Sequence, residues 1–250
     1  MKLALVTPWA SPFIWTKFCK NLAGLLTHFH RPGWEVEVFF GRGCDPAARH
    51  VSCCNQALEW GADLICIIGA DQVHPLNMLD TLLDDYEDTG GQVIGALVPF
   101  RGYVPGQGMK PFQPMGWRMR TKGTDIAVGK LGESAAWEPI DPAAGELQRA
   151  DIIGSGVLLF HVDFLKSLKK PWFYYGVNED MQRIADMDTR FVWRLRSEAQ
   201  AEVWVDTTIK IKHLHAFEID DTFQDRFADW AEPGVSDEDI IKHLPQGAEV

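Results

Sequence analysis

The first hundred residues alternate between short apolar runs and segments in which apolar residues recur every three or four positions. The first pattern is typical of strands and the second of helices. The predicted strands are Leu3–Val6, Glu35–Phe40, Leu64–Ile68 and Val93–Val98, and the predicted helices cover residues 15–25, 46–60 and 75–86. Strands that alternate with helices favour a mainly parallel sheet covered by helices. The sequence therefore predicts an α/β fold.

The run Leu64–Ile68 has the composition of the central strand of this sheet. Its residues are all apolar and rich in isoleucine, which suits a strand covered on both faces. Gly69 and Ala70 follow, and such small residues let a ligand approach the backbone. Asp71 comes next, just past the carboxyl end of the strand, where open α/β sheets bind their ligands. Asp71 is therefore a candidate site residue, although a lone aspartate here is also typical of a turn or a cap.

The helix over residues 46–60 has clear start and stop signals. Asp45 is the predicted N-cap, Pro46 the first helical residue, and Gly61 follows the last turn. Arg49 lies in the first turn, where a cation opposes the helix dipole. A phosphate or a surface salt bridge would compensate this charge, and the sequence does not choose between them.

The second half of the chain has a different texture. From Pro99 to Gly145 proline and glycine are frequent and periodicity is weak, which predicts a long irregular insertion, as a lid or an acceptor platform. Regular patterns return as predicted strands over 150–160, 202–206 and 208–215, and as predicted helices over 163–168 and 188–195. Asp188 begins its helix, so a plain N-cap is one interpretation of it. If 208–215 is one strand, His213 and His215 point to the same side.

The formal net charge of −11 excludes a general nucleic-acid coat, because phosphate contacts need a basic surface. The charge is uneven, however. Residues 216–250 hold ten acidic and two basic side chains, whereas residues 98–130 hold six basic and one acidic. The basic segment is compatible with a local anionic substrate. The ten tryptophans suit a site that stacks rings or sugars, but core packing is their commoner use.

Cysteine usage and the amino terminus bear on the compartment. The cysteines form no C-x-x-C pair, which predicts reduced, buried thiols in a cytoplasmic protein. The first apolar run is only four residues long before Thr7 and Pro8, too short for a signal peptide. No apolar run reaches membrane-spanning length, so we expect no membrane span.

Four short motifs resemble those of metal-dependent glycosyltransferases with the GT-A fold, especially the compact family-2-like enzymes of phages and bacteria. They are Pro46-Ala47-Ala48-Arg49, similar to the family's a-R element; Ile67-Ile68-Gly69-Ala70-Asp71, similar to its strand ending in D-x-D; Ile153–Leu159 with Lys170–Phe173, similar to G-x-G-F and P-W-F; and Met187–Phe191 through Trp204–Asp206 to Lys212-His213, similar to E-D-x-x-F, v-D and H. The resemblance covers Leu3 to about His215. It implies a GT-A-like, mainly parallel central sheet flanked by helices, with a long irregular insertion.

The resemblance also implies a metal site and a catalytic base. Asp71 corresponds to the second aspartate of D-x-D and His213 to a late metal-ligating histidine, so the two would bind Mn²⁺ or Mg²⁺. Gly69 stands where the first aspartate would be, and His74 is a candidate to replace that contact. Asp188 corresponds to the general base that takes the proton of the acceptor hydroxyl in inverting enzymes, with Asp180 as a rival. Met187 stands where the family has a glutamate before this aspartate.

The remaining site residues are assigned by the same resemblance to the donor and the acceptor. Thr7, Pro8 and Trp9 would face the nucleotide base, and Arg49 the diphosphate or nucleoside of the donor, with Ala70 and Asp71 beside the nucleotide sugar. The pocket for the sugar and the acceptor would be lined by Gly154, Ser155, Gly156 and Trp172.

A single GT-A-like domain is expected over residues 1–250. Residues 1–98 would form the nucleotide-binding half, 99–149 the insertion or lid, 150–215 the acceptor and metal half, and 216–250 an acidic tail. The implied enzyme transfers a sugar from a UDP- or GDP-linked donor to a hydroxyl of a glycan or another compound. Modified DNA is compatible with the basic insertion, but no residue supports it directly.

Two other functions are alternatives. A nucleotidyltransferase should carry a glycine-rich phosphate loop after the first strand, where this chain has residues 7–12 with no glycine. A non-catalytic protein that binds a nucleotide sugar or a glycan is favoured by the missing carboxylate at Gly69.

Overall fold

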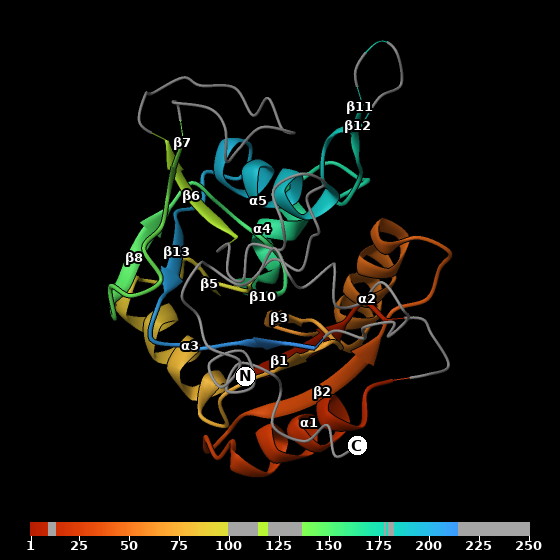
Figure 1. Cartoon of the computed structure of the whole chain (residues 1–250). Helices are drawn as coiled ribbons and strands as arrows, with labels where there is room; N and C mark the ends of the chain where they lie inside the picture. Colours follow the sequence, from red (N-terminus) through yellow and green to blue (C-terminus); the bar gives the residue numbers. More distant parts are fainter. Residues whose placement is uncertain (10–13, 100–114, 120–136, 178, 180–182, 215–250) are drawn as a thin grey trace, which may run out of the picture. The chain divides into compact units, whose positions relative to one another are not determined.

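The computed structural model describes residues 1–9, 14–99, 115–119, 137–177, 179 and 183–214. They belong to one compact unit, formed by Met1–Pro99 and Pro114–Leu214. A second unit, Phe100–Gln113 with His215–Val250, lies outside the described residues, so the predicted domain division stays a prediction. The first unit is built on a seven-stranded sheet of order β2-β1-β3-β10-β5-β13-β8 (Figure 1). The strands are β1 Lys2–Thr7, β2 Glu35–Phe40, β3 Leu64–Ile68, β5 Val93–Ala96, β8 Leu147–Ala150, β10 Val157–His161 and β13 Val203–Asp206.

The sheet is mainly parallel, as predicted. Strands β1, β2, β3, β5 and β13 run in one direction. Strand β10 is inserted antiparallel between β3 and β5, and β8 runs antiparallel along β13 at the edge. The antiparallel insertion matters for the site, because it places the residues that precede β10 beside the carboxyl end of β3.

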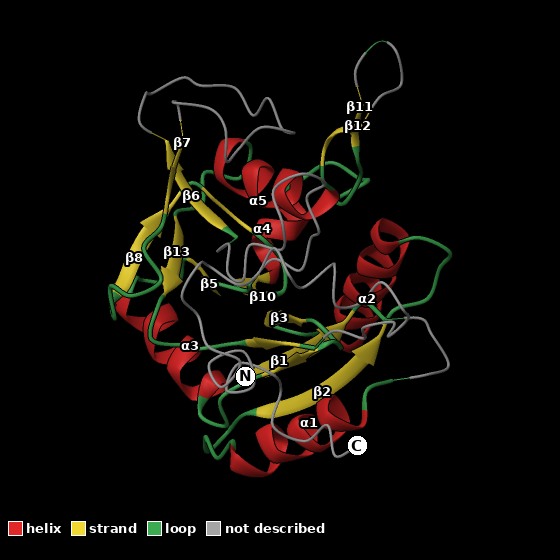
Figure 2. Cartoon of the chain, viewed as in Figure 1, coloured by secondary structure: helices red, strands yellow, loops and turns green. Residues whose placement is uncertain are grey.

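Helices cover both faces of the sheet (Figure 2). They are α1 Thr16–His28, α2 Pro46–Trp60, α3 Met78–Asp88, α4 Val162–Ser167 and α5 Met187–Ser197. Alternate residues of β3 point to opposite faces, so Ile65 and Ile67 pack with α2, α4 and α5. Leu64, Cys66 and Ile68 pack with α1 and α3. The central strand is therefore buried on both sides, as its composition predicted.

Helix α2 begins and ends where its local signals predicted. The Asp45 carboxylate accepts a hydrogen bond from the backbone N–H of Ala48 at 3.1 Å, and Pro46 is the first helical residue. Gly61 closes the helix with φ of 81°, a conformation that glycine adopts without strain.

The segment 150–160 was expected as one strand, and this expectation is wrong at its centre. Strand β9, Ile152–Ile153, is separated from β10 by the turn Gly154–Gly156. Strand β9 pairs with β6, Gly116–Met119, which also pairs with β7, Trp137–Pro139. The chain thus changes sheets at the glycine turn. Strands β6 and β7 fall in the stretch expected to be irregular, and they are too short to give a detectable sequence period.

The segment 208–215 was also expected as one strand, and this expectation is wrong. Only β14, Lys212–His213, is extended, and it pairs with β4, Gln72–Val73. Asp206 accepts hydrogen bonds from the backbone N–H and the hydroxyl of Thr208, which folds the chain into a turn after β13. His215 lies outside the described residues. A further short pair joins β11, Gly176–Val177, to β12, Arg183–Ala185.

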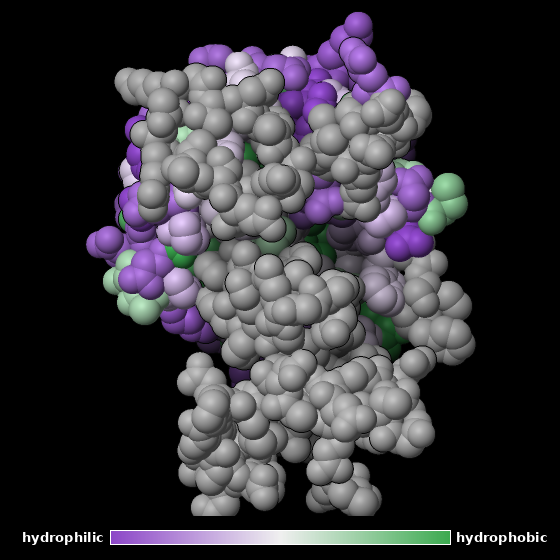
Figure 3. Space-filling model, turned by 45° about the horizontal axis from the view of Figure 1, so that its top comes forward, coloured by the Kyte–Doolittle hydropathy of each residue, from purple (hydrophilic) through white to green (hydrophobic). Residues whose placement is uncertain are grey.

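The described surface agrees only partly with the expectations drawn from composition. All cysteines are free, but Cys19 and Cys44 are exposed, so the expected burial holds for the other three only. The side chains described on the face drawn in Figure 3 are mostly hydrophilic, with small separate hydrophobic areas. Across the described residues, no helix is both long and apolar enough to cross a membrane.

Two carboxyl groups meet where α3 packs against the end of β13. The pKa of Asp85 is raised to about 7, first by burial and then by the charge and hydrogen bond of Asp206. Unfolded aspartate has a pKa of about 3.9. The folded chain therefore keeps a proton that the unfolded chain has lost, so this stabilisation is complete below about pH 4 and disappears as the pH rises through about 7.

Replacing Asp85 with asparagine should remove this pH dependence, because an amide donates the same hydrogen bond without ionising. We expect the melting temperature of Asp85→Asn to fall less than that of the native chain between pH 5 and pH 8. Glu59→Gln, an exposed change on α2, is the control, because Glu59 is not among the groups that shift the pKa of Asp85. Equal pH slopes for the native chain and Asp85→Asn would contradict this expectation.

Candidate functional site

The predicted site residues gather where β3 ends and β10 begins. Ile68 is paired with Val157, and the backbone N–H of Gly69 donates to the carbonyl of Gly156 at 2.9 Å. This bond fixes the segment 69–72 against the turn Gly154–Gly156. The carboxyl end of a central strand is the edge at which open α/β sheets bind ligands, so the pairing places both segments at such an edge.

The structure brings together Asp71 and His213, which lie far apart in the sequence. In the β4–β14 pair His213 lies opposite Gln72, and Leu214 N–H donates to the Asp71 carbonyl at 2.7 Å. The Nε2 atom of His213 lies 3.4 Å from Oδ2 of Asp71. The other ring nitrogen, Nδ1, is 2.7 Å from the carbonyl oxygen of Pro99 and must donate its proton there. Nε2 therefore faces the carboxylate as a lone pair in the neutral ring and as an N–H donor in the protonated ring.

This arrangement fits a divalent cation in its donor chemistry. An imidazole whose second nitrogen is bonded to a carbonyl is the usual form of a histidine ligand, and a carboxylate supplies a hard oxygen. A charge-assisted contact between the two side chains is the simpler interpretation. Among the described residues, no group of three or more His, Cys, Asp or Glu side chains is placed to hold a metal. The role of Asp71 and His213 as ligands stays a prediction.

A buried polar chain lies behind Asp71. The backbone N–H of His74 donates to Oδ1 of Asn21, and the Asn21 NH₂ group donates to the His74 carbonyl, both at 2.7 Å. The ring atom Nδ1 of His74 is 3.1 Å from the same Oδ1. Its Nε2 is 3.1 Å from Oε1 of Gln72. Burial lowers the pKa of His74 to about 4, which leaves the ring neutral near pH 7. Both ring nitrogens thus face partners inside the protein, Asn21 and Gln72, and the charge of Asp71 also acts on the ring.

Asp188 lies beside Gly154, the first residue of the glycine turn, in the first turn of α5. A Cβ atom on Gly154 would be 3.6 Å from Oδ2 of Asp188, so the carboxylate faces this backbone. The N-cap of α5 is Asp186, not Asp188, so the N-cap interpretation of Asp188 is wrong. Asp188 accepts a hydrogen bond from Thr189 N–H through Oδ1 at 2.7 Å. Asp180 lies outside the described residues.

One site residue was missed by sequence reasoning, His50, which contacts the predicted pocket residue Ser155. His50 Nδ1 lies 2.8 Å from the Pro46 carbonyl and donates to it, and Nε2 accepts the Ser155 hydroxyl at 3.2 Å. Burial is the main cause of the lowered pKa of His50, so the ring is neutral. The pair tethers α2 to the glycine turn. The sequence signal for a buried role of His50 is its position on the same helix face as the apolar residues Ala47 and Cys54.

The expected nucleotide end lies at the carboxyl end of β1. Thr7 is fully buried, and its carbonyl accepts from the backbone N–H groups of Trp9 at 2.7 Å and Gly41 at 2.9 Å. A Cβ on Gly41 would lie 2.9 Å from Arg49 Cβ and 3.1 Å from Pro8 Cα, so these residues are neighbours. Arg49 donates only long bonds, of 3.3 and 3.4 Å, to the carbonyls of Gly43 and Cys44. A salt bridge of Arg49 is not found among the described residues.

Ala70 and Trp172 are both 3% exposed. Trp172 packs in the core below α5, and within the described part of the chain its indole N–H has no hydrogen-bond partner. The Lys170 ammonium lies 4.4 Å from its ring. The roles expected of Ala70 and Trp172 stay predictions.

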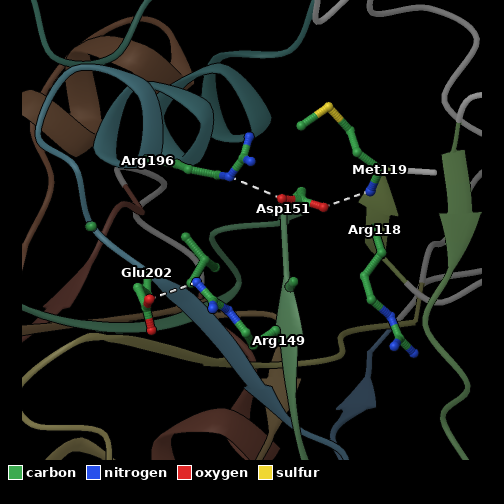
Figure 4. Close-up of a pocket in the computed structure, with 9 residues that line it drawn as sticks. Arg118, Met119, Arg149, Asp151, Arg196 and Glu202 are labelled. Carbon is green, nitrogen blue, oxygen red and sulfur yellow. Dashed lines mark hydrogen bonds and ion pairs between the residues drawn. The ribbon is translucent and has the colours of Figure 1, made fainter. Parts of the chain in front are cut away.

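A cavity of about 290 Å³ lies elsewhere in the unit, among β6, β8, β13 and the end of α5 (Figure 4). None of the predicted site residues lines it. Arg149 is paired with Glu202 at 2.7 Å and Arg196 with Asp151 at 2.9 Å. Because these two arginines are already compensated by carboxylates, we do not take this cavity for the candidate site.

The comparison with known proteins bears on the fold. No protein-family model matches the sequence, and no curated protein matches it. Among solved structures, A197 from STIV is similar over 86% of each chain with a TM-score of 0.52 and 12% identity. The crystal structure of GalNAc-T7 with UDP, GalNAc and Mn²⁺ is similar over 87% of this chain and 43% of that one, with a TM-score of 0.51 and 9% identity. The chain therefore has the GT-A-like fold that the motifs predicted.

Proposed function

We propose that this chain is a metal-dependent glycosyltransferase that moves a sugar from a UDP- or GDP-linked donor to an acceptor hydroxyl. One observation carries the proposal: the carboxylate of Asp188 lies next to Gly154, and the segment that holds Asp71, the partner of His213, is bonded to Gly156 of the same turn. Asp71 and His213 suit the binding of a cation that in turn binds a diphosphate. Asp188 suits the role of a general base. The GT-A-like fold, and the UDP and Mn²⁺ in the GalNAc-T7 structure, support this assignment.

Different site residues would have different roles in the reaction. Asp71 and His213 would hold Mn²⁺ or Mg²⁺, which supplies positive charge to a leaving diphosphate. The Pro99 carbonyl fixes the tautomer of His213 for this task. Arg49 and residues 7–9 would bind the nucleotide, beside the donor's phosphates. Gly154 and Gly156 would border the sugar, where they lie beside Asp188 and Gln72 respectively.

Asp188 would act on the acceptor. Its carboxylate takes the proton of the acceptor hydroxyl while that oxygen bonds to the anomeric carbon and the bond to the diphosphate breaks. This single displacement inverts the anomeric centre.

A second candidate function has a specific observation in its favour. Gly69 supplies no carboxylate beside Asp71, which favours a non-catalytic protein that binds a nucleotide sugar. Such a protein would bind the donor with little dependence on Asp188 and release no nucleoside diphosphate.

A thermal-shift screen of UDP- and GDP-sugars, with and without Mn²⁺, tests the proposal. A ligand at 100 times its dissociation constant stabilises the folded state by about 2.7 kcal/mol. For a chain of this size that is a rise of roughly 5–10 °C. We expect one donor class to give such a rise only with the metal, and to release free nucleoside diphosphate. Binding without release would favour the second candidate, and no shift with any donor would contradict both.

A further inference from the structure

The side chain of Gln72 occupies the space that a side chain at position 69 would need. A Cβ on Gly69 would lie 2.5 Å from Nε2 of Gln72 and 3.0 Å from Oδ1 of Asp71. A Cβ on Gly156 would lie 2.6 Å from the same Gln72 atom. The carboxamide therefore packs over two paired glycine backbones and borders the same small volume as the Asp71 carboxylate.

Gln72 also faces the second predicted ligand. In the β4–β14 pair Gln72 is directly opposite His213, and opposite residues of antiparallel strands carry their side chains on the same side. The Gln72 side chain is 3% exposed, and its position is fixed by His74 and Asn21 rather than by solvent. The Gln72 amide is thus fixed by contacts inside the protein, unlike the amide of an exposed glutamine.

The amide can present its oxygen to the volume beside Asp71. Oε1 of Gln72 is 3.1 Å from Nε2 of His74, and Nε2 of Gln72 lies over Gly69 and Gly156. A half-turn about the Cγ–Cδ bond exchanges the oxygen and the nitrogen of an amide without moving the rest of the side chain. The half-turn places the carbonyl oxygen over Gly69 and Gly156 and the NH₂ group beside His74.

We propose that the Gln72 carbonyl oxygen is a third ligand of the Asp71–His213 cation site and takes the place of the carboxylate that residue 69 lacks. The inference rests on the proposed function, and it deepens it. An amide carbonyl is a hard oxygen ligand suited to Mn²⁺ or Mg²⁺ but carries no charge. The site then has one negative charge only, so it binds the cation weakly alone and well together with the diphosphate of the donor.

Titration calorimetry with Mn²⁺ and with UDP tests this inference without any turnover. Gln72→Met keeps the length of the side chain and removes its oxygen, so UDP should bind about 10-fold more weakly with Mn²⁺ and unchanged without it. Gln72→Glu adds a charge, so Mn²⁺ alone should bind about 10-fold more tightly. Gln200→Glu, the same change on the exposed loop after α5, should match the native chain.

Each outcome separates the inference from the proposed function. If the native chain binds UDP with Mn²⁺ but both Gln72 variants keep its affinities, the inference is wrong and the proposed function stands. If the native chain binds neither UDP nor GDP, with or without Mn²⁺, the proposed function is wrong and the inference falls with it. Melting curves identify a variant that does not fold, and Gln72→Met then decides alone if Gln72→Glu is lost.

Discussion

Asp188→Asn is expected to lower the rate of sugar transfer by about 10²–10⁴-fold while leaving UDP binding near that of the native chain. Asparagine keeps the shape of the side chain and an oxygen for the Thr189 N–H, so α5 should begin as before. It cannot accept the proton of an acceptor hydroxyl. The rate is measured as Mn²⁺-dependent release of UDP from the donor sugar that the thermal-shift screen identifies, and binding by calorimetry.

The neighbouring carboxylates provide the controls for this result. Asp186→Asn changes the N-cap of the same helix, and we expect it to retain transfer. Asp180→Asn tests the rival base. Transfer that survives in Asp188→Asn but disappears in Asp180→Asn would move the catalytic role to Asp180.

Asp71→Ala is expected to abolish most of the Mn²⁺-dependent part of UDP binding. Residues that only orient a metal ligand contribute about 10–100-fold to metal affinity, so loss of a ligand itself should cost at least about 100-fold. His213→Ala should act in the same direction, because the two side chains face one another at 3.4 Å. Binding of UDP without metal should change much less.

Asp163→Ala is the matched control, since this carboxylate is 73% exposed at the start of α4. Calorimetry of UDP with and without Mn²⁺ gives the comparison. Equal Mn²⁺-dependent affinities for the native chain and Asp71→Ala would remove Asp71 from the metal site and leave its contact with His213 as an ordinary ion pair.

The parts of the fold that the sequence predicted are those with local causes. Helix α2 is the clearest case, because Asp45, Pro46 and Gly61 act within one turn of the helix ends. Strand β3 was found from its composition, since burial on both faces demands a continuous apolar run. In both cases the deciding interactions lie close together in the sequence.

The parts that were missed depend on distant partners. The apolar run 150–160 looks continuous, but Gly154–Gly156 divides it between two sheets whose other strands come from elsewhere in the chain. Thr208 turns because the Asp206 side chain binds its backbone, which alternation alone does not reveal.

The candidate site shows the same division between local and distant causes. Asp71 was found from its place after β3, and Asp188 and His213 from motif resemblance. The contacts of His50 with Ser155, and of Gln72 with His74, join side chains whose roles appear only after the strands are placed.

Anomalous diffraction from crystals grown with UDP and MnCl₂ tests the central claim most directly. The account predicts one manganese peak bonded to Oδ2 of Asp71 and Nε2 of His213, beside the diphosphate. Bound UDP with no manganese at these two atoms, or manganese bound at a different place in the chain, would contradict it.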